Sequence, residues 1–100
     1  MARLIIWTQR AQKERIEISK YWISRTNSIF YSKKLNELLK DSLRLISKYP
    51  SIGKLTDKEN IRVKVLRNFL IFYEITENEI VVLSLWDCRQ NPEDLTKIIK

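Results

Sequence analysis

The sequence contains no histidine and a single cysteine, Cys88. Histidine is the commonest metal ligand and the commonest general acid–base in proteins, so its absence narrows the chemistry open to this chain. With one cysteine as well, we exclude a structural zinc site and an internal disulfide, and we expect no bound metal or cofactor. Because no histidine or metal is there to activate Cys88, we interpret it as a buried small apolar residue.

Glycine, proline and long apolar runs are also scarce. One glycine and two prolines among 100 residues, without a low-complexity tract, favour an ordered chain. The amino-terminal stretch MARLIIWTQR has too short an apolar run for a signal peptide or a membrane span. We therefore expect a soluble, cytoplasmic protein without a membrane partner. A hydrophobic content of 44% predicts one domain, residues 1–100, with a substantial core.

Negative charge is in short supply. Nineteen Lys and Arg residues against twelve Asp and Glu residues give a formal net charge of +7. This excess favours an anionic partner, either a nucleic acid or an acidic protein segment, because it raises the field that such a partner feels. The alternative is a lysine-rich surface that is simply solvated.

The segment 61–91 has the pattern of a three-stranded meander. Ile61, Val63 and Val65 alternate with Arg62 and Lys64, which places apolar groups on one face and cations largely on the other. Two nearly continuous runs of β-branched and aromatic residues follow. Asn68 is expected to provide the positive φ of the first turn. In order, we predict the strand Ile61–Leu66, the turn Arg67–Asn68, the strand Phe69–Ile75, the turn Glu77–Asn78 and the strand Ile80–Trp86.

Two amphipathic helices precede this meander. After a short strand over Ala2–Trp7, Thr8 is placed to cap a helix over Gln9–Arg25, and Asn27 or Ser28 is placed to cap a second helix. A few polar residues join the two helices, which predicts an antiparallel hairpin. The apolar stripe of the second helix comprises Tyr31, Leu35, Leu38, Ser42, Leu45 and Tyr49, broadened by Leu39, Leu43 and Ile46.

Punctuating residues set the remaining boundaries. Pro50 ends the second helix, and Gly53 is expected to provide a positive-φ position at the start of a polar loop over Ser51–Asn60. After the meander, Asn91 and Pro92 favour a short closing helix with Leu95, Ile98 and Ile99 on its apolar side. The order β-α-α-β-β-β-(α) predicts an α+β domain in which a small, mainly antiparallel sheet packs against a helical hairpin.

Several local strings in this order can be compared with known families. They are Ile6–Thr8 followed by Ala11, Tyr49–Pro50 followed by Gly53, Arg62, Phe69–Ile75 followed by Ile80–Leu83, and Arg89. With these strings the whole chain resembles the RelE/ParE superfamily of toxins from bacterial type II toxin–antitoxin modules. The resemblance implies an antitoxin partner and one of two targets. RelE-like members cut mRNA on the ribosome, whereas ParE-like members lack the nuclease residues and poison DNA gyrase.

The RelE-like branch implies a set of cations that bind the scissile phosphate. Attack of a ribose 2′-OH on phosphorus builds up charge, which the planar fork of arginine stabilises well. Arg62 and Lys64 share one strand face and match the basic strand pair of that branch, and Arg89 approximates its other active arginine. The alternative is a set of edge-strand cations that oppose aggregation. Further candidate nucleic-acid contacts are Lys54, Lys58, Arg67 and Trp86.

Two departures speak against mRNA cleavage. Leu70 occupies the middle-strand position where the RelE-like pattern has an arginine, and no tyrosine or histidine follows Tyr73. A nuclease would then need another base, such as Glu74, Asp87 or a lysine of lowered pKa.

Other functional-group residues are interpreted as structural. Tyr73 is expected in the core with its hydroxyl at the rim, and Trp86 between the sheet and a helix, with base stacking as an alternative. Asp87 is expected to pair with Arg89 or a neighbouring cation. The helical carboxylates Glu14 and Glu17 are interpreted as surface charges.

The residues leave more than one function open. The first hypothesis is a growth-inhibiting toxin that acts on ribosome-bound mRNA or on DNA gyrase and is neutralised by a cognate antitoxin. The alternatives are a non-toxic basic nucleic-acid-binding module and an inactive toxin remnant, although the sequence has no recognisable nucleic-acid-binding signature. We expect an antitoxin helix or strand with acidic residues to bind between the helical hairpin and the sheet edge.

Overall fold

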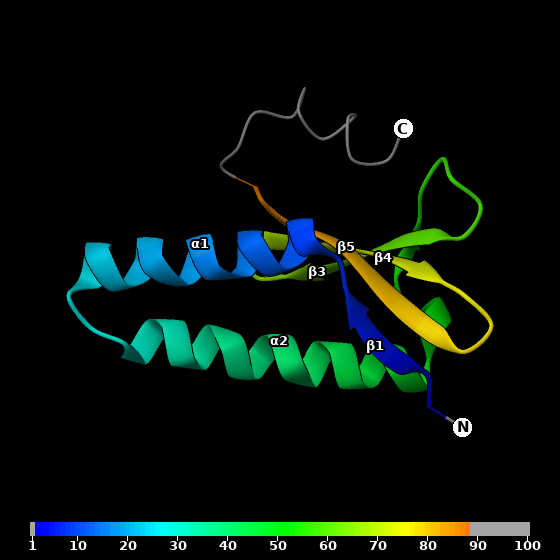
Figure 1. Ribbon diagram of the computed structural model, residues 1–100, viewed down its shortest axis with the longest axis horizontal. Helices are drawn as coiled ribbons and strands as arrows, with labels where there is room; N and C mark the ends of the chain where they lie inside the picture. The colour runs from blue at the N-terminus through cyan, green and yellow to red at the C-terminus, as the bar shows by residue number, and fades with distance from the viewer. Residues whose placement is uncertain (1, 89–100) are drawn as a thin grey trace.

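The computed structural model describes residues 2–88, which form two helices, a short 3-10 turn and a five-stranded sheet (Figure 1). This arrangement confirms the predicted α+β class. The predicted closing helix over residues 91–99, and Arg89, lie outside the described residues. Of the helices within residues 2–88, none is long and apolar enough to cross a membrane. In chain order the elements are β1 (Leu4–Trp7), α1 (Gln9–Thr26), α2 (Phe30–Lys48), η1 (Pro50–Ile52), β2 (Lys54–Leu55), β3 (Ile61–Leu66), β4 (Phe69–Ile75) and β5 (Glu79–Asp87).

The sheet has the strand order β1-β5-β4-β3-β2, with β1 parallel to β5 and the other neighbours antiparallel. The three predicted strands of the meander are confirmed. In the turn between β3 and β4, however, Arg67 and not Asn68 adopts the left-handed conformation, with φ 54°. The strand β2 was not predicted, because two residues are too few to show a periodic pattern.

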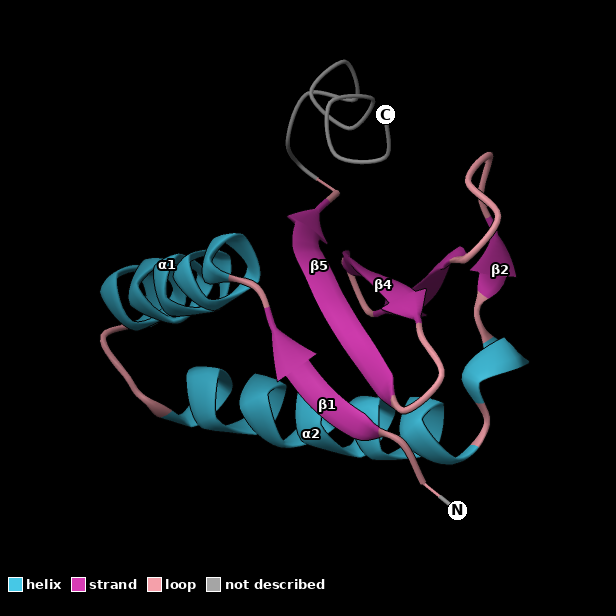
Figure 2. Cartoon of the chain, turned by 45° about the vertical axis from the view of Figure 1, so that its right-hand side comes forward, coloured by secondary structure: helices cyan, strands magenta, loops and turns pink. Residues whose placement is uncertain are grey.

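The helices α1 and α2 lie antiparallel beside each other, as predicted (Figures 1 and 2). Thr8 caps α1 by accepting a hydrogen bond from the backbone N of Ala11 at 3.1 Å. The same hydroxyl donates to the backbone O of Val82 at 2.9 Å, which ties the start of α1 to β5. At the connection, Asn27 ends α1 with φ 53°, and the hydroxyl oxygen of Ser28 accepts from the backbone N of Phe30 at 3.1 Å.

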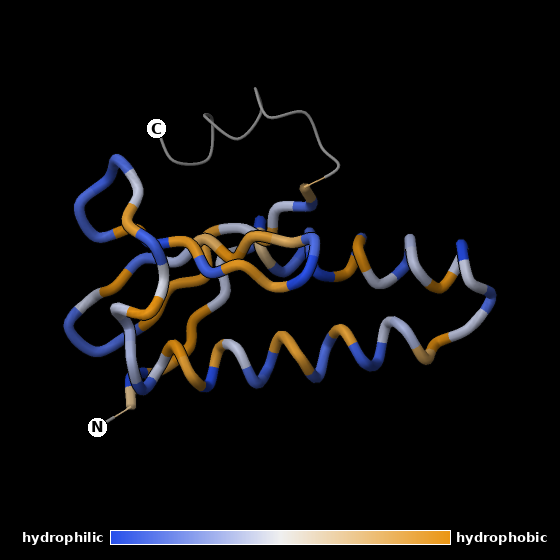
Figure 3. Tube along the Cα trace, turned by 180° about the vertical axis from the view of Figure 1, so that it is seen from behind, coloured by the Kyte–Doolittle hydropathy of each residue, from blue (hydrophilic) through white to orange (hydrophobic). Residues whose placement is uncertain are grey.

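The buried stripe of α2 differs in part from the predicted one. Leu45 and Tyr49 are 45% and 60% exposed, so these two stripe members do not lie in the core. Figure 3 shows apolar and polar positions alternating along the helices, while the centre of the sheet is mostly apolar. Two overlapping stripes fit the helical period of this sequence, and contact with the sheet selects one of them. The apolar side chains of α2 that are buried are Leu35, Leu39, Leu43 and Ile46.

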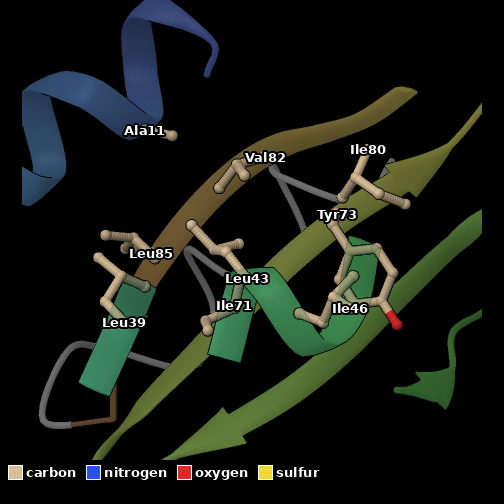
Figure 4. Close-up of a cluster of buried hydrophobic side chains, with 9 residues drawn as sticks. All are labelled: Ala11, Leu39, Leu43, Ile46, Ile71, Tyr73, Ile80, Val82 and Leu85. Carbon is tan, nitrogen blue, oxygen red and sulfur yellow. The ribbon is translucent and has the colours of Figure 1, made fainter. Parts of the chain in front are cut away.

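The core lies between α2 and the central strands, with α1 closing one side (Figure 4). Side chains of α2 face side chains of β4 and β5, so one face of the sheet is covered by the helices. The cluster consists of Ala11, Leu39, Leu43, Ile46, Ile71, Tyr73, Ile80, Val82 and Leu85.

Glu14 joins α1 to β5 and is not a simple surface charge, contrary to the interpretation from the sequence. Pairing between β1 and β5 ends at Trp7, so the later part of β5 has no strand on that side. There, Glu14 Oε1 accepts hydrogen bonds from Ser84 Oγ at 2.8 Å and from the backbone N of Leu85 at 3.2 Å. The carboxylate therefore occupies the place of a strand neighbour.

We expect Glu14→Ala to lower the free energy of unfolding by about 1–3 kcal/mol, since it leaves the Leu85 N–H and the buried Ser84 hydroxyl without this acceptor. Urea denaturation measures the difference. Glu17 is exposed on the same helix, and Glu17→Ala should stay within about 0.5 kcal/mol of wild type. Equal effects of the two substitutions would contradict the role given to Glu14.

Candidate functional site

Two side chains from neighbouring strands hold the turn that follows α2. Arg62 on β3 and Tyr73 on β4 lie directly opposite each other. The Tyr73 hydroxyl donates to the backbone O of Pro50 at 2.6 Å and accepts from the backbone N of Gly53 at 3.0 Å. The Arg62 guanidinium donates through Nη1 to the backbone O of Ser51 at 3.1 Å and of Gly53 at 2.7 Å. Four hydrogen bonds thus fix residues 50–53 to the sheet, and the predicted phosphate-binding arginine makes two of them.

Gly53 is required here by space and not by backbone conformation. Its φ is −73°, so the predicted positive-φ role is wrong. A Cβ atom at this position would clash with the Tyr73 hydroxyl. Tyr73 itself is fully buried, which confirms its predicted place in the core. Burial raises the pKa of the Tyr73 phenol above its ordinary value of 10.0 and outweighs the opposing effects of the Gly53 hydrogen bond and the Arg62 charge.

The register of the sheet separates the predicted cations from the middle-strand position. Arg62 and Lys64 pair with Tyr73 and Ile71, whose side chains lie in the core under the helices. Directly paired residues of antiparallel strands share a face, so Arg62 and Lys64 lie on the helix side of the sheet. Leu70 is the next residue along β4 and therefore points to the other side. The two cations and the Leu70 position do not converge.

The remaining candidate contacts are spread over different surfaces. Lys54 pairs with Val63 on the face of the sheet away from the helices and is exposed. Lys58 and Arg67 are exposed in two different connections of the sheet. Trp86 is buried, but it pairs with Leu70, so it lies on the face away from the hairpin and not between sheet and helix as predicted.

Two residues near the end of β5 differ in their exposure. Asp87 is buried opposite Phe69. Cys88 is exposed, so its predicted burial is wrong; it follows the last residue of β5, and its backbone N donates to the backbone O of Asn68 at 2.9 Å. Within residues 2–88, no group of three or more Cys, Asp or Glu side chains is placed to hold a metal ion.

A groove of about 780 Å³ is lined by residues of α1, α2 and β1. Figure 2 shows these three elements, with β1 at the edge of the sheet. Apolar side chains contribute to its surface, and Arg15 stacks over the ring of Trp7 at 4.7 Å from the ring centroid. Among the residues that the structure describes, four cations and no carboxylate line this groove. The lining residues are Ile5, Trp7, Arg15, Ile16, Ser19, Lys20, Ile23, Asn36, Leu39, Lys40, Leu43, Arg44 and Ser47.

This groove lies where an antitoxin segment was expected, between the hairpin and the sheet edge. The sequence predicted an exposed surface at this location but not the residues that line the groove, because the way α1, α2 and β1 pack together decides which side chains face it. The signal that could have identified part of it is the cation pair Lys40 and Arg44, which are four residues apart on one side of α2.

Comparison with known proteins finds a matching family model and several similar solved structures. A family model described as the ParE toxin of type II toxin–antitoxin system, parDE, matches residues 5–92. A chain of a solved structure described as the chromosomal ParDE TA system from P. aeruginosa superposes with a TM-score of 0.73 and 13% sequence identity, covering 86% of this chain and 96% of that chain. No curated protein sequence matches. At 13% identity the structural likeness shows the fold alone. The residues that the family model matches include those that line the groove and all the described candidate cations.

Proposed function

The chain belongs to the ParE toxin family of type II toxin–antitoxin systems, and from this premise we propose that it arrests growth by acting on a protein, DNA gyrase, and not by cutting mRNA. We further propose that a cognate antitoxin neutralises it by binding the groove between α1, α2 and β1.

The observation that carries the choice of target is the separation of Arg62 and Lys64 from Leu70. Cleavage of RNA requires several donors to converge on one phosphate, at the position where charge develops. Arg62 and Lys64 lie on the helix side of the sheet, and Leu70 supplies no cation on the other side. The Arg62 guanidinium also donates to two backbone carbonyls, and a phosphate would have to compete with these carbonyls for the guanidinium. This geometry supports a target other than mRNA.

Three measurements on the same protein test the choice of target. After induction in a bacterial host, we expect no codon-phased mRNA ends above background. The purified chain should inhibit supercoiling by DNA gyrase, and induced cells should accumulate double-strand DNA breaks. Codon-phased cuts that disappear in Lys64→Ala, together with unimpaired supercoiling, would instead establish an mRNA nuclease.

The groove supports the antitoxin assignment through its chemistry. An amphipathic helix buries its apolar face in such a groove, and acidic residues on its flanks meet the cations of the rim. The product of the adjacent small reading frame, co-expressed with this chain, should copurify with it and restore growth. If the product neither copurifies with this chain nor restores growth, the antitoxin assignment is contradicted. The gyrase assay still tests the target independently.

A further inference from the structure

The connection between α1 and α2 lies at the end of the helical hairpin farthest from the sheet (Figure 1). Apolar side chains are exposed at this end. We call residues 23–34 the hairpin tip. Phe30, the first residue of α2, is 81% exposed, and its neighbour Ile29 is 49% exposed. Ile23, in the last part of α1, is also exposed. Single exposed apolar residues are ordinary on a protein surface. Here three of them fall within eight consecutive residues, and one is an aromatic ring that is almost wholly in water. Such a group indicates a contact surface.

The surroundings of these side chains carry charge of one sign. From Ile18 to Asn36 the sequence has no Asp or Glu. All the cations in that stretch are exposed, and they are Lys20, Arg25, Lys33 and Lys34. A surface that joins apolar groups to unopposed cations is complementary to an acidic protein surface with an apolar depression. A phosphate backbone would match the cations but would offer no apolar depression for Ile29 and Phe30.

The tip is held in a fixed conformation. Trp22 of α1 packs on Tyr31 of α2 with 4.5 Å between ring centroids, which joins the two helices just behind Phe30. The hydroxyl of Thr26 donates to the backbone O of Trp22 at 2.7 Å, and Ser28 accepts from the backbone N of Phe30. A rigid element loses little conformational entropy on binding, so its apolar groups contribute more fully to affinity.

We propose that the hairpin tip is the surface through which this toxin engages its protein target, with the Phe30 ring inserted into an apolar depression of an acidic surface. The proposal rests on the proposed function, since it requires a protein target. The tip is separate from most of the antitoxin groove, whose lining includes neither Ile29 nor Phe30. Lys20 and Ile23 also line the groove, so the groove reaches the tip, and a helix bound in it would obstruct a bulky target there.

The test compares Phe30→Ser with Leu45→Ser in the full chain. Leu45 is 45% exposed on the same helix and belongs to neither the tip nor the groove lining. Circular dichroism should show both variants folded. We expect Phe30→Ser to weaken inhibition of purified DNA gyrase by about 30-fold or more, as for a buried aromatic anchor, and to relieve growth arrest. It should still copurify with the product of the adjacent reading frame. Leu45→Ser should behave as wild type in all three assays.

Each other outcome is decisive. If folded Phe30→Ser, and Ile29→Ser combined with it, arrest growth as wild type does, the proposal is overturned. Loss of copurification with the adjacent product would assign the tip to the antitoxin and would also overturn it. The proposal is also overturned if the double variant Lys33→Ala with Lys34→Ala loses both toxicity and binding to a DNA duplex, while Phe30→Ser keeps both. If wild type arrests growth without inhibiting gyrase, the proposed target is wrong, and the growth assay alone decides on the tip.

Discussion

Replacing Tyr73 with alanine is expected to lower the free energy of unfolding by about 3–5 kcal/mol, as for other fully buried aromatic residues. Tyr73 contributes its ring to the core beside Ile46 and Ile80, so its removal leaves a cavity that close-packed neighbours fill only in part. The substitution also deprives the backbone O of Pro50 and N of Gly53 of their hydrogen-bond partner. Chemical denaturation of the purified chain measures the loss. A loss below about 1 kcal/mol is well under the usual cost of such a cavity and would show that neither the ring nor the hydroxyl is needed for stability.

Tyr73→Phe separates the hydroxyl from the ring. We expect a loss of about 1–3 kcal/mol at neutral pH, because the buried N–H of Gly53 would have no acceptor while the ring still fills the core. The pH dependence gives a second readout. Burial raises the pKa of Tyr73, so the folded protein resists ionisation of this phenol; its contribution to stability is complete below pH 10.0 and falls as the pH rises from there through the raised pKa. Tyr73→Phe should lack this alkaline component.

The three strands of the meander and the first helix were predictable because their signals are local. β-branched and aromatic residues fill β4 and β5, and Thr8 caps α1 through a bond to a residue three positions away. The alternation in β3 also showed correctly that Arg62 and Lys64 share a face. It did not show which face the helices cover. The cations, and not Val63 and Val65, turned out to lie on the helix side, because the pairing with β4 decides this and an alternating pattern does not contain it.

Tertiary contacts decide the parts that sequence reasoning missed. Glu14 was taken for a surface charge because its helix neighbours are charged, but its partners Ser84 and Leu85 lie about seventy residues further along the chain. Gly53 was expected to have positive φ, as glycines after helices often do. It is needed instead because Tyr73, twenty residues away, approaches its backbone. In both cases the decisive contact is long-range, and one sequence without related sequences gives no signal for it.

The combined substitution Lys40→Glu with Arg44→Glu is expected to weaken antitoxin binding by about 100-fold or more. Both side chains line the groove on α2. After the substitution, acidic groups of a bound helix would face like charges, which costs several kcal/mol. A tenfold loss of affinity corresponds to about 1.4 kcal/mol. Both are exposed, so the fold should tolerate the change. In cells, co-expression of the adjacent reading frame should no longer restore growth, although toxicity itself persists because the hairpin tip is unchanged.

The matched control reverses two cations away from the groove. Lys13→Glu with Lys48→Glu produces the same change in net charge, at exposed positions on α1 and α2 that do not line the groove. If the field of the whole chain attracted the antitoxin, both double variants would lose affinity equally and the wild-type affinity would fall steeply with salt. If the groove is the binding site, the control binds as wild type does and only Lys40→Glu with Arg44→Glu escapes neutralisation. Because the two variants carry equal charge, only the position of the cations distinguishes these outcomes.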